Sequence, residues 1–296
     1  AIQHLSIVTN ADNNKPFKLI NVANSSLHKL YVVETSMEQR TLKKVILNEN
    51  IDTLTIGGYI SRGDVPQQSV ELVGLSRLNR LKCLSYNPDF SPIATKDLPK
   101  NIEELYIGGS GNVPYKDGDS FDYSHLSKLK IYSNGKFISA NMKLSTSIDS
   151  IYLFPSQVFG DLKELDFSDL KFTKADIYIG WLTRNDVELP ILKRFVFPAT
   201  LKQLKLSNAQ SEVLDLSRCT HLKDLYVDDS RTGERAIKKL ILPKNLKKSD
   251  FKRQHKSEFE NDYAFKLSDI NNETVIENLP SWVENDGNGT YSVPND

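Results

Sequence analysis

Apolar residues recur along the chain in a short phrase, with leucine or a similar residue at its first, fourth and sixth positions. The phrase occurs at 27–32, 42–47, 78–83, 126–131, 162–167, 192–197, 222–227 and 237–242. Its fourth and sixth positions have the period of two that places side chains on one face of a strand. Each phrase therefore predicts a short strand with one buried face.

A second phrase alternates with the first. It occurs at 47–58, 98–109, 144–155, 197–208 and 242–251, where an apolar residue precedes a three-residue turn and a short strand follows. Proline often opens that turn, because proline cannot donate a hydrogen bond within a sheet. Two strands joined in this way predict successive sides of one flattened coil with a shared apolar interior. Stacked coils bury such an interior continuously, which predicts a solenoid.

The segments "ILPKNLKKSDF", "FPATLKQLKLSN" and "RCTHLKDLYV" resemble leucine-rich repeats of the BspA-like (Treponema pallidum) type, and the L-P-x-x-L-x-x-L phrase also resembles the FNIP repeat. The resemblance covers most of residues 25 to 251. It implies an α/β-class leucine-rich-repeat solenoid, strand-rich with little helix, as a right-handed curved array of irregular coils with terminal caps. The expected divisions are an N-terminal cap at 1–25, repeats at 26–251 and a C-terminal cap at 252–296. Within the last, 281–293 predicts a β-hairpin around an Asn/Asp/Gly turn.

Catalytic and metal-binding patterns are absent from the sequence. It holds no nucleophile elbow, phosphate-binding loop or zinc-protease motif. Cys83 and Cys219 lie far apart and are expected to be buried apolar residues, and His125 and His221 precede equivalent leucines. We therefore expect neither an enzyme, nor a metal site, nor a cofactor.

Charge and hydropathy restrict the partners. The 296 residues carry 38 basic and 38 acidic side chains, so no global field favours nucleic acid. No apolar run approaches the roughly 18 residues that a membrane-spanning helix needs.

Residues between the strand leucines are expected to face outward on one sheet and to form a recognition surface. The residues selected for binding are Tyr31, Lys82, Lys128, Lys130, Tyr132, Asp166, Tyr226 and Asp228. Tyrosines are favoured because aromatic side chains carry much of the energy in protein interfaces. A solvated sheet whose charges only maintain solubility is the alternative interpretation.

Two segments depart from the repeat and are further candidates, because inserted loops often line binding sites. They are 108–123, with turn residues, and 173–190, which predicts one or two helical turns around Trp181. Trp181 alternatively fills the edge of a coil. The run 238–256 is densely basic, which suits either a polar terminal coil or an anionic ligand.

The sequence thus predicts a non-catalytic binding module, monomeric, whose partner is another protein. A carbohydrate or polyanion bound by basic strands is the alternative. The resemblance implies a secreted or cell-surface location and a role in adhesion or host interaction.

Overall fold

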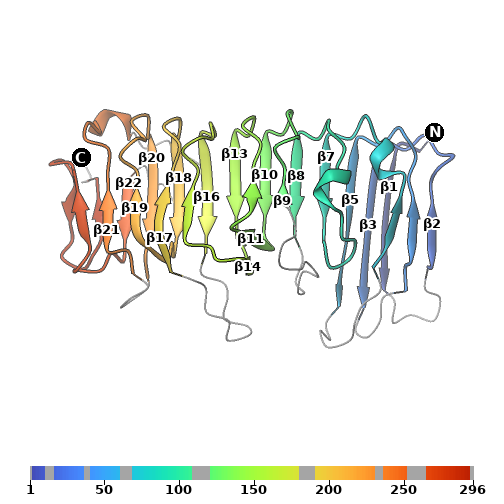
Figure 1. Ribbon diagram of the computed structural model, residues 1–296, viewed down its shortest axis with the longest axis horizontal. Coiled ribbons are helices and arrows are strands. Elements are labelled where there is room, and N and C mark those ends of the chain that lie inside the picture. Colours follow the sequence, from blue (N-terminus) through green and yellow to red (C-terminus); the bar gives the residue numbers. More distant parts are fainter. Residues whose placement is uncertain are drawn as a thin grey trace. The chain divides into compact units, whose positions relative to one another are not determined.

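The computed structural model describes residues 2–10, 17–36, 41–60, 69–108, 121–179, 191–230, 236–251 and 265–293. The chain divides into two compact units, Ala1–Ser147 and Ile148–Asp296, called unit 1 and unit 2. Strands dominate both (Figure 1). In the described ranges the helical elements are the short 3-10 helices η1 (Leu75–Arg77), η2 (Thr95–Asp97) and η4 (Lys248–Asp250). The prediction of a strand-rich chain with little helix is confirmed.

Unit 1 holds two rows of parallel strands, between which the chain alternates. The first sheet has the spatial order β1 (His4–Asn10), β3 (Lys29–Ser36), β5 (Thr53–Ile60), β7 (Cys83–Tyr86), β8 (Glu104–Ile107) and β10 (Ile131–Asn134). The second sheet consists of β2 (Leu19–Asn21), β4 (Lys44–Ile46) and β6 (Glu71–Val73). Further along the chain β9 (Phe121–Asp122) pairs with β12 (Met142–Lys143), and β11 is Phe137–Ser139. β1 and β2, from the expected N-terminal cap, take part in these sheets.

Unit 2 repeats the alternation. Its first sheet orders β13 (Ser150–Leu153), β16 (Lys174–Tyr178), β18 (Gln203–Ser207), β20 (Asp224–Asp228) and β22 (Phe265–Ser268) in parallel. Its second sheet is β15 (Glu164–Asp166), β17 (Leu192–Val196), β19 (Ser211–Asp215), β21 (Lys239–Ile241) and β23 (Val275–Glu277). β14 is Gln157–Phe159. β24 (Glu284–Asn285) and β25 (Tyr291–Ser292) pair antiparallel within the segment expected to form a hairpin.

The doubled phrase at 192–208 shows how a short sequence serves both sheets. Its first half forms β17 in the second sheet and its second half forms β18 in the first sheet. Between them, the Leu201 amide donates to the Pro198 carbonyl at 3.1 Å, which closes the turn. Phe195 and Leu204 are both buried, so the two strands point their apolar side chains inward.

The core consists of apolar ladders that run across the strands of each unit. In unit 1, Leu30, Leu54, Leu84 and Leu105 occupy successive register positions and are all nearly inaccessible to solvent. In unit 2, the corresponding ladder in the first sheet is Ile151, Ala175, Leu204, Leu225 and Phe265. Because the strands are in register, every strand must present its inward residues at the same height. The ladder therefore fixes which side chains remain outside.

Tyr132 is a correction to the sequence prediction, which placed it on the outer surface. It lies opposite Leu105 in the ladder and is fully buried. β10 begins only at Ile131, so Tyr132, and not Ile131, takes the first inward position. The same shift at β7 buries Leu84 and leaves Cys83 half-buried, which corrects the expected burial of Cys83. Cys219 is buried as expected.

At β10, polar side chains also occupy inward positions of the ladder. Asn134 is buried opposite Ile107, and its Nδ2 donates to the Tyr132 hydroxyl oxygen at 2.9 Å. The Asn134 Oδ1 accepts the backbone amides of Lys136 and Phe137. Lys136 is also fully buried, and its Nζ lies 2.8 Å from Asp89 Oδ2. Burial lowers the pKa of Lys136, while the hydrogen bond to Asp89 opposes that shift.

The segment 173–190 is described only in its first part. That part forms β16, which lies between β13 and β18. Ala175 and Ile177 alternate inward there, the period of a strand. The residues around Trp181, for which one or two helical turns were expected, are not among those that the structure describes.

The inward position of Tyr132 gives a direct test. Tyr132→Ala should lower the free energy of unfolding by about 3–5 kcal/mol, because it removes a buried aromatic ring and leaves a cavity. The neighbouring outward Ile131→Ala should cost less than about 1 kcal/mol. Urea unfolding followed by circular dichroism measures both. A larger loss for Ile131→Ala than for Tyr132→Ala would show that the opposite face of β10 is buried.

Candidate functional site

The predicted recognition surface is divided between two sheets. Tyr31 lies on β3, and Tyr226 and Asp228 lie on β20, all in the first sheets of their units. Asp166 lies on β15 in the second sheet of unit 2. The phrases used for the prediction therefore do not form one continuous face, because those at 27–32 and 222–227 form strands of the first sheets, whereas that at 162–167 forms a strand of the second sheet of unit 2.

Three predicted lysines lie in turns instead of strands. Lys82 precedes β7, and Lys128 and Lys130 precede β10. Lys82 Nζ lies 3.3 Å from Glu103 Oε1, and Lys128 Nζ donates to Asn101 Oδ1 at 2.8 Å. The expected basic strand face in unit 1 is wrong, because the strands begin one residue or more after these lysines.

Asp166 has a local structural role. Its Oδ1 accepts the Ser168 amide at 2.8 Å and closes a turn at the end of β15. The same Asp-x-Ser turn occurs at two other strand ends. Asp122 Oδ1 accepts the amide of Ser124, and Asp215 Oδ1 accepts the amide of Ser217. These pairs are repeated turn closures at the ends of strands.

An outward row of aromatic and charged residues crosses the first sheet of unit 2. Register places Tyr152, Asp176, Lys205, Tyr226 and Lys266 side by side on β13, β16, β18, β20 and β22. Each is half-buried or exposed. With Lys174 and Asp228 on the flanking rows, these residues are called the unit 2 face.

Several side chains of the unit 2 face contact one another. Lys174 Nζ lies 5.7 Å from the centroid of the Tyr152 ring, within the range of a cation–π contact. Lys205 Nζ lies 3.7 Å from Asp176 Oδ2, near the outer limit of an ion pair. The Tyr226 hydroxyl donates to Asp228 Oδ2 at 3.3 Å. These contacts position the two tyrosine rings, and part of each side chain remains accessible to solvent.

Two carboxylates of this face lie in unfavourable surroundings. Burial raises the pKa of Asp176, against the lowering effect of Lys205. Burial also raises the pKa of Asp228, and the nearby charge of Asp269 adds to the shift. Asp228 Oδ1 is buried without a hydrogen-bond partner in the described residues. A donor or cation from outside would relieve this cost.

Charges on the second sheet of unit 2 are closely paired by contrast. Arg194 Nη2 contacts Asp215 Oδ2, and Lys239 Nζ lies 2.6 Å from Glu277 Oε1. Burial favours a higher pKa of Asp215, but the hydrogen bonds from Ser217 and Arg194 together lower it. Because these charges already have partners on neighbouring strands, this surface offers less to a ligand than the unit 2 face.

The first sheet of unit 1 is less charged. Register places Ser6, Tyr31, Thr55, Ser85, Tyr106 and Ser133 in its central outward row. Tyr31 has a relative exposure of 38%, and the Tyr106 hydroxyl donates to Glu104 Oε2 at 3.0 Å. Hydroxyl groups predominate, so this row lacks the charge pattern of the unit 2 face.

Sequence reasoning missed Tyr152, Lys174, Asp176, Lys205 and Lys266. The sequence does contain a signal for two of them, because Tyr152 and Lys205 fall between the apolar residues of the second phrase. The predicted surface includes only residues in or next to the first phrase, so it omits both. Residues 109–120 and 180–190, which contain most of both insertions, and 252–256 of the basic run lie outside the described residues.

Other candidate chemistry receives little support. Burial raises the pKa of Cys83 to about 11 and that of Cys219 to about 12, which disfavours the nucleophilic thiolate. Among the residues that the structure describes, no group of three His, Cys, Asp or Glu side chains is arranged to hold a metal ion. Within the same ranges, none of the helices has the length and apolar character needed to traverse a bilayer.

Comparisons with protein-family models, curated proteins and solved structures gave no significant match to the chain. The resemblance to leucine-rich repeats therefore rests on the sequence phrases alone.

Asp228→Asn tests the electrostatics of the unit 2 face. A raised folded-state pKa means that the ionised carboxylate destabilises the protein at neutral pH. We expect Asp228→Asn to raise Tm at pH 7 by on the order of 1 °C, since solvent weakens the effect.

The advantage of the variant should shrink as the pH falls through the raised folded-state pKa of Asp228, because the wild-type carboxyl then becomes neutral. Scanning calorimetry between pH 7 and pH 4 measures this, with the exposed Glu212→Gln on β19 as a control. A lower Tm for Asp228→Asn than for wild type at pH 7 would contradict the conclusion that the ionised Asp228 carboxylate destabilises the protein.

Proposed function

We propose that the chain is a leucine-rich-repeat solenoid that binds another protein through the unit 2 face, without catalysis. The observation that carries the proposal is the outward row from Tyr152 to Lys266 across five in-register parallel strands. Alternation of strands between two sheets supports the solenoid, because each coil contributes one strand to each row.

The composition of the face suits a protein partner. Tyrosine contributes a large, rigid contact surface, and its hydroxyl adds a hydrogen-bonding group. Tyr152 and Tyr226 are held by Lys174 and Asp228, so ordering them on binding costs little additional entropy. The strained Asp228 carboxylate suits a partner that supplies a lysine, an arginine or an amide donor at this point.

Mixed charge argues against the alternative of a polyanion. Asp176 follows Lys174 on the outward face of β16 and lies opposite Lys205 on β18, and Asp228 lies beside the row that ends in Lys266. A sulfated glycan or other polyanion would meet these carboxylates as it followed the lysines. The turn lysines of unit 1 lie apart from any shared strand face.

The proposal includes a non-catalytic role, supported by the disfavoured thiolates and by the structural use of the Asp-x-Ser pairs. A monomeric state and a secreted or cell-surface location with a role in adhesion belong to the proposal through the leucine-rich-repeat resemblance alone.

The test compares two folded variants for binding to a partner captured by wild type from cell-surface extracts. The face variant is Tyr152→Ala, Lys205→Ala, Tyr226→Ala. The control is Lys193→Ala, Glu212→Ala, exposed positions on the second sheet of unit 2. We expect the face variant to weaken binding at least about 100-fold, because tyrosine hot spots each contribute about 2 kcal/mol or more.

The control variant should bind like wild type. Equal binding by the face variant would exclude this surface as the site. Binding that falls about tenfold or more for each doubling of salt concentration would support the polyanion alternative.

A further inference from the structure

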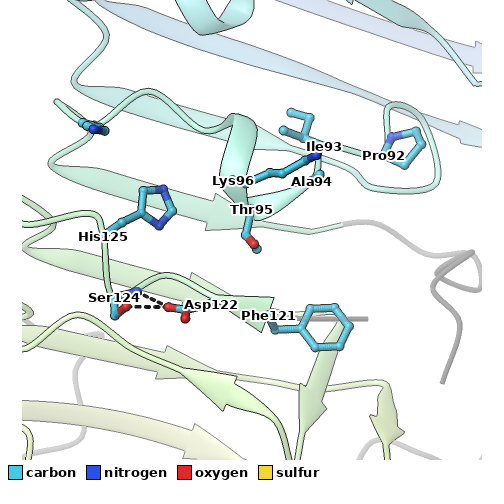
Figure 2. Close-up of a pocket in the computed structure, with 10 residues that line it drawn as sticks. Pro92, Ile93, Ala94, Thr95, Lys96, Phe121, Asp122, Ser124 and His125 are labelled. Carbon is cyan, nitrogen blue, oxygen red and sulfur yellow. Dashed lines mark hydrogen bonds between the residues drawn. The ribbon is translucent and has the colours of Figure 1, made fainter. Parts of the chain in front are cut away.

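Unit 1 contains a cleft of about 710 Å³, whose lining residues are drawn in Figure 2. One side comes from η2 and the chain around it, and the other from β9 and the turn that follows. The lining residues are Pro92, Ile93, Ala94, Thr95, Lys96, Lys100, Phe121, Asp122, Ser124 and His125.

The cleft arises from an interruption of the second sheet. In the described part of unit 1 this sheet ends at β6, and the next connection forms η2 in place of a strand. β9 lies against η2, while its strand partner is β12. A three-residue helix does not fill the row as a strand would, and space remains between the two sides.

The two lysines of the cleft have no charged partner in the described residues. Lys96 and Lys100 are exposed and form no ion pair there. The ring of His125 is half-buried, but its Nε2 atom is buried without a hydrogen-bond partner. Leaving such a nitrogen unpaired costs free energy.

The acidic group of the cleft is already engaged. Asp122 Oδ1 accepts the Ser124 hydroxyl at 2.5 Å and the Ser124 amide at 2.9 Å. Lys143 Nζ lies 3.9 Å from Asp122 Oδ2. The hydrogen bond from the Ser124 hydroxyl is the main reason that the pKa of Asp122 is lowered. The Asp122 carboxylate is thus already hydrogen-bonded within its own turn, while Lys96 and Lys100 on the opposite side of the cleft remain without an ion-pair partner in the described residues.

We propose that this cleft binds a small organic anion, with its carboxylate beside Lys96, Lys100 and His125. Pro92, Ala94 and the buried ring of Phe121 supply the apolar side on which a short hydrocarbon or aromatic part packs. The volume lies within the range of small-molecule sites. The inference is independent of the protein-binding role of unit 2.

Benzoate is the probe that matches this chemistry, and benzamide is its neutral counterpart. Titration followed by backbone amide NMR should give saturable shifts at residues 92–100 and 121–125 with benzoate, with a Kd on the order of 1 mM. Benzamide should bind at least tenfold more weakly, because it lacks the charge that the two lysines attract. Equal affinity for both probes, or shifts that never saturate, would overturn the proposal.

Two pairs of lysine substitutions distinguish benzoate binding in the cleft from a general response to surface charge. Lys96→Gln, Lys100→Gln should weaken benzoate binding at least tenfold. The control Lys18→Gln, Lys43→Gln changes two exposed lysines of unit 1 outside the cleft and should leave the affinity unchanged. Equal weakening by both pairs would mean that benzoate responds only to net charge, which overturns the site.

His125→Leu adds a second readout. It should abolish saturable benzoate binding while keeping or raising Tm, because an unpaired buried nitrogen is replaced by an apolar group. A folded His125→Leu protein that binds benzoate like wild type would remove His125, and with it the proposed geometry, from the site.

Discussion

The in-register ladder of inward side chains is the constraint on which the rest of the structure depends. Each strand must place an apolar residue at the level set by its neighbours, as Leu54 does between Leu30 and Leu84. Because strand side chains alternate, this requirement also decides which residues face solvent. The aromatic and charged row from Tyr152 to Lys266 is a consequence of the buried ladder beside it. The same strand register therefore determines both which residues form the core and which form the candidate binding surface.

Much of the strand content was predictable, because period-two apolar spacing is a local property. The doubled phrase at 192–208 indicated two strands on different sides of a coil, and β17 and β18 lie in different sheets. The strand starts were harder to predict. At β7 and β10 the apolar spacing admits two parities, and only pairing with neighbouring strands places Leu84 and Tyr132 inside. Parity is a tertiary property that the phrase alone does not contain.

The candidate site was less predictable than the fold. Tyr226 and Asp228 fall on the unit 2 face, whereas Lys82, Lys128 and Lys130 lie in the connections before β7 and β10. The difference arises because a residue between two leucines faces outward only if the strand has already begun. Asp166 shows another limit, since an acidic residue at a strand end can close a turn through its own side chain. The raised pKa of Asp228 arises first from its burial and then from the charge of Asp269, and a local sequence motif contains neither.

The most direct measurement of the central claim is cysteine labelling along β20, with and without the captured partner. Single cysteines would replace residues 224 to 228 in a Cys83→Ser, Cys219→Ser background, and Lys193→Cys would report on the second sheet. We expect rapid labelling at 224, 226 and 228, slow labelling at 225 and 227, and partner protection at the outward positions alone. Labelling without a period of two would contradict the register. Protection at Lys193→Cys with none at 226 would place recognition on the other sheet.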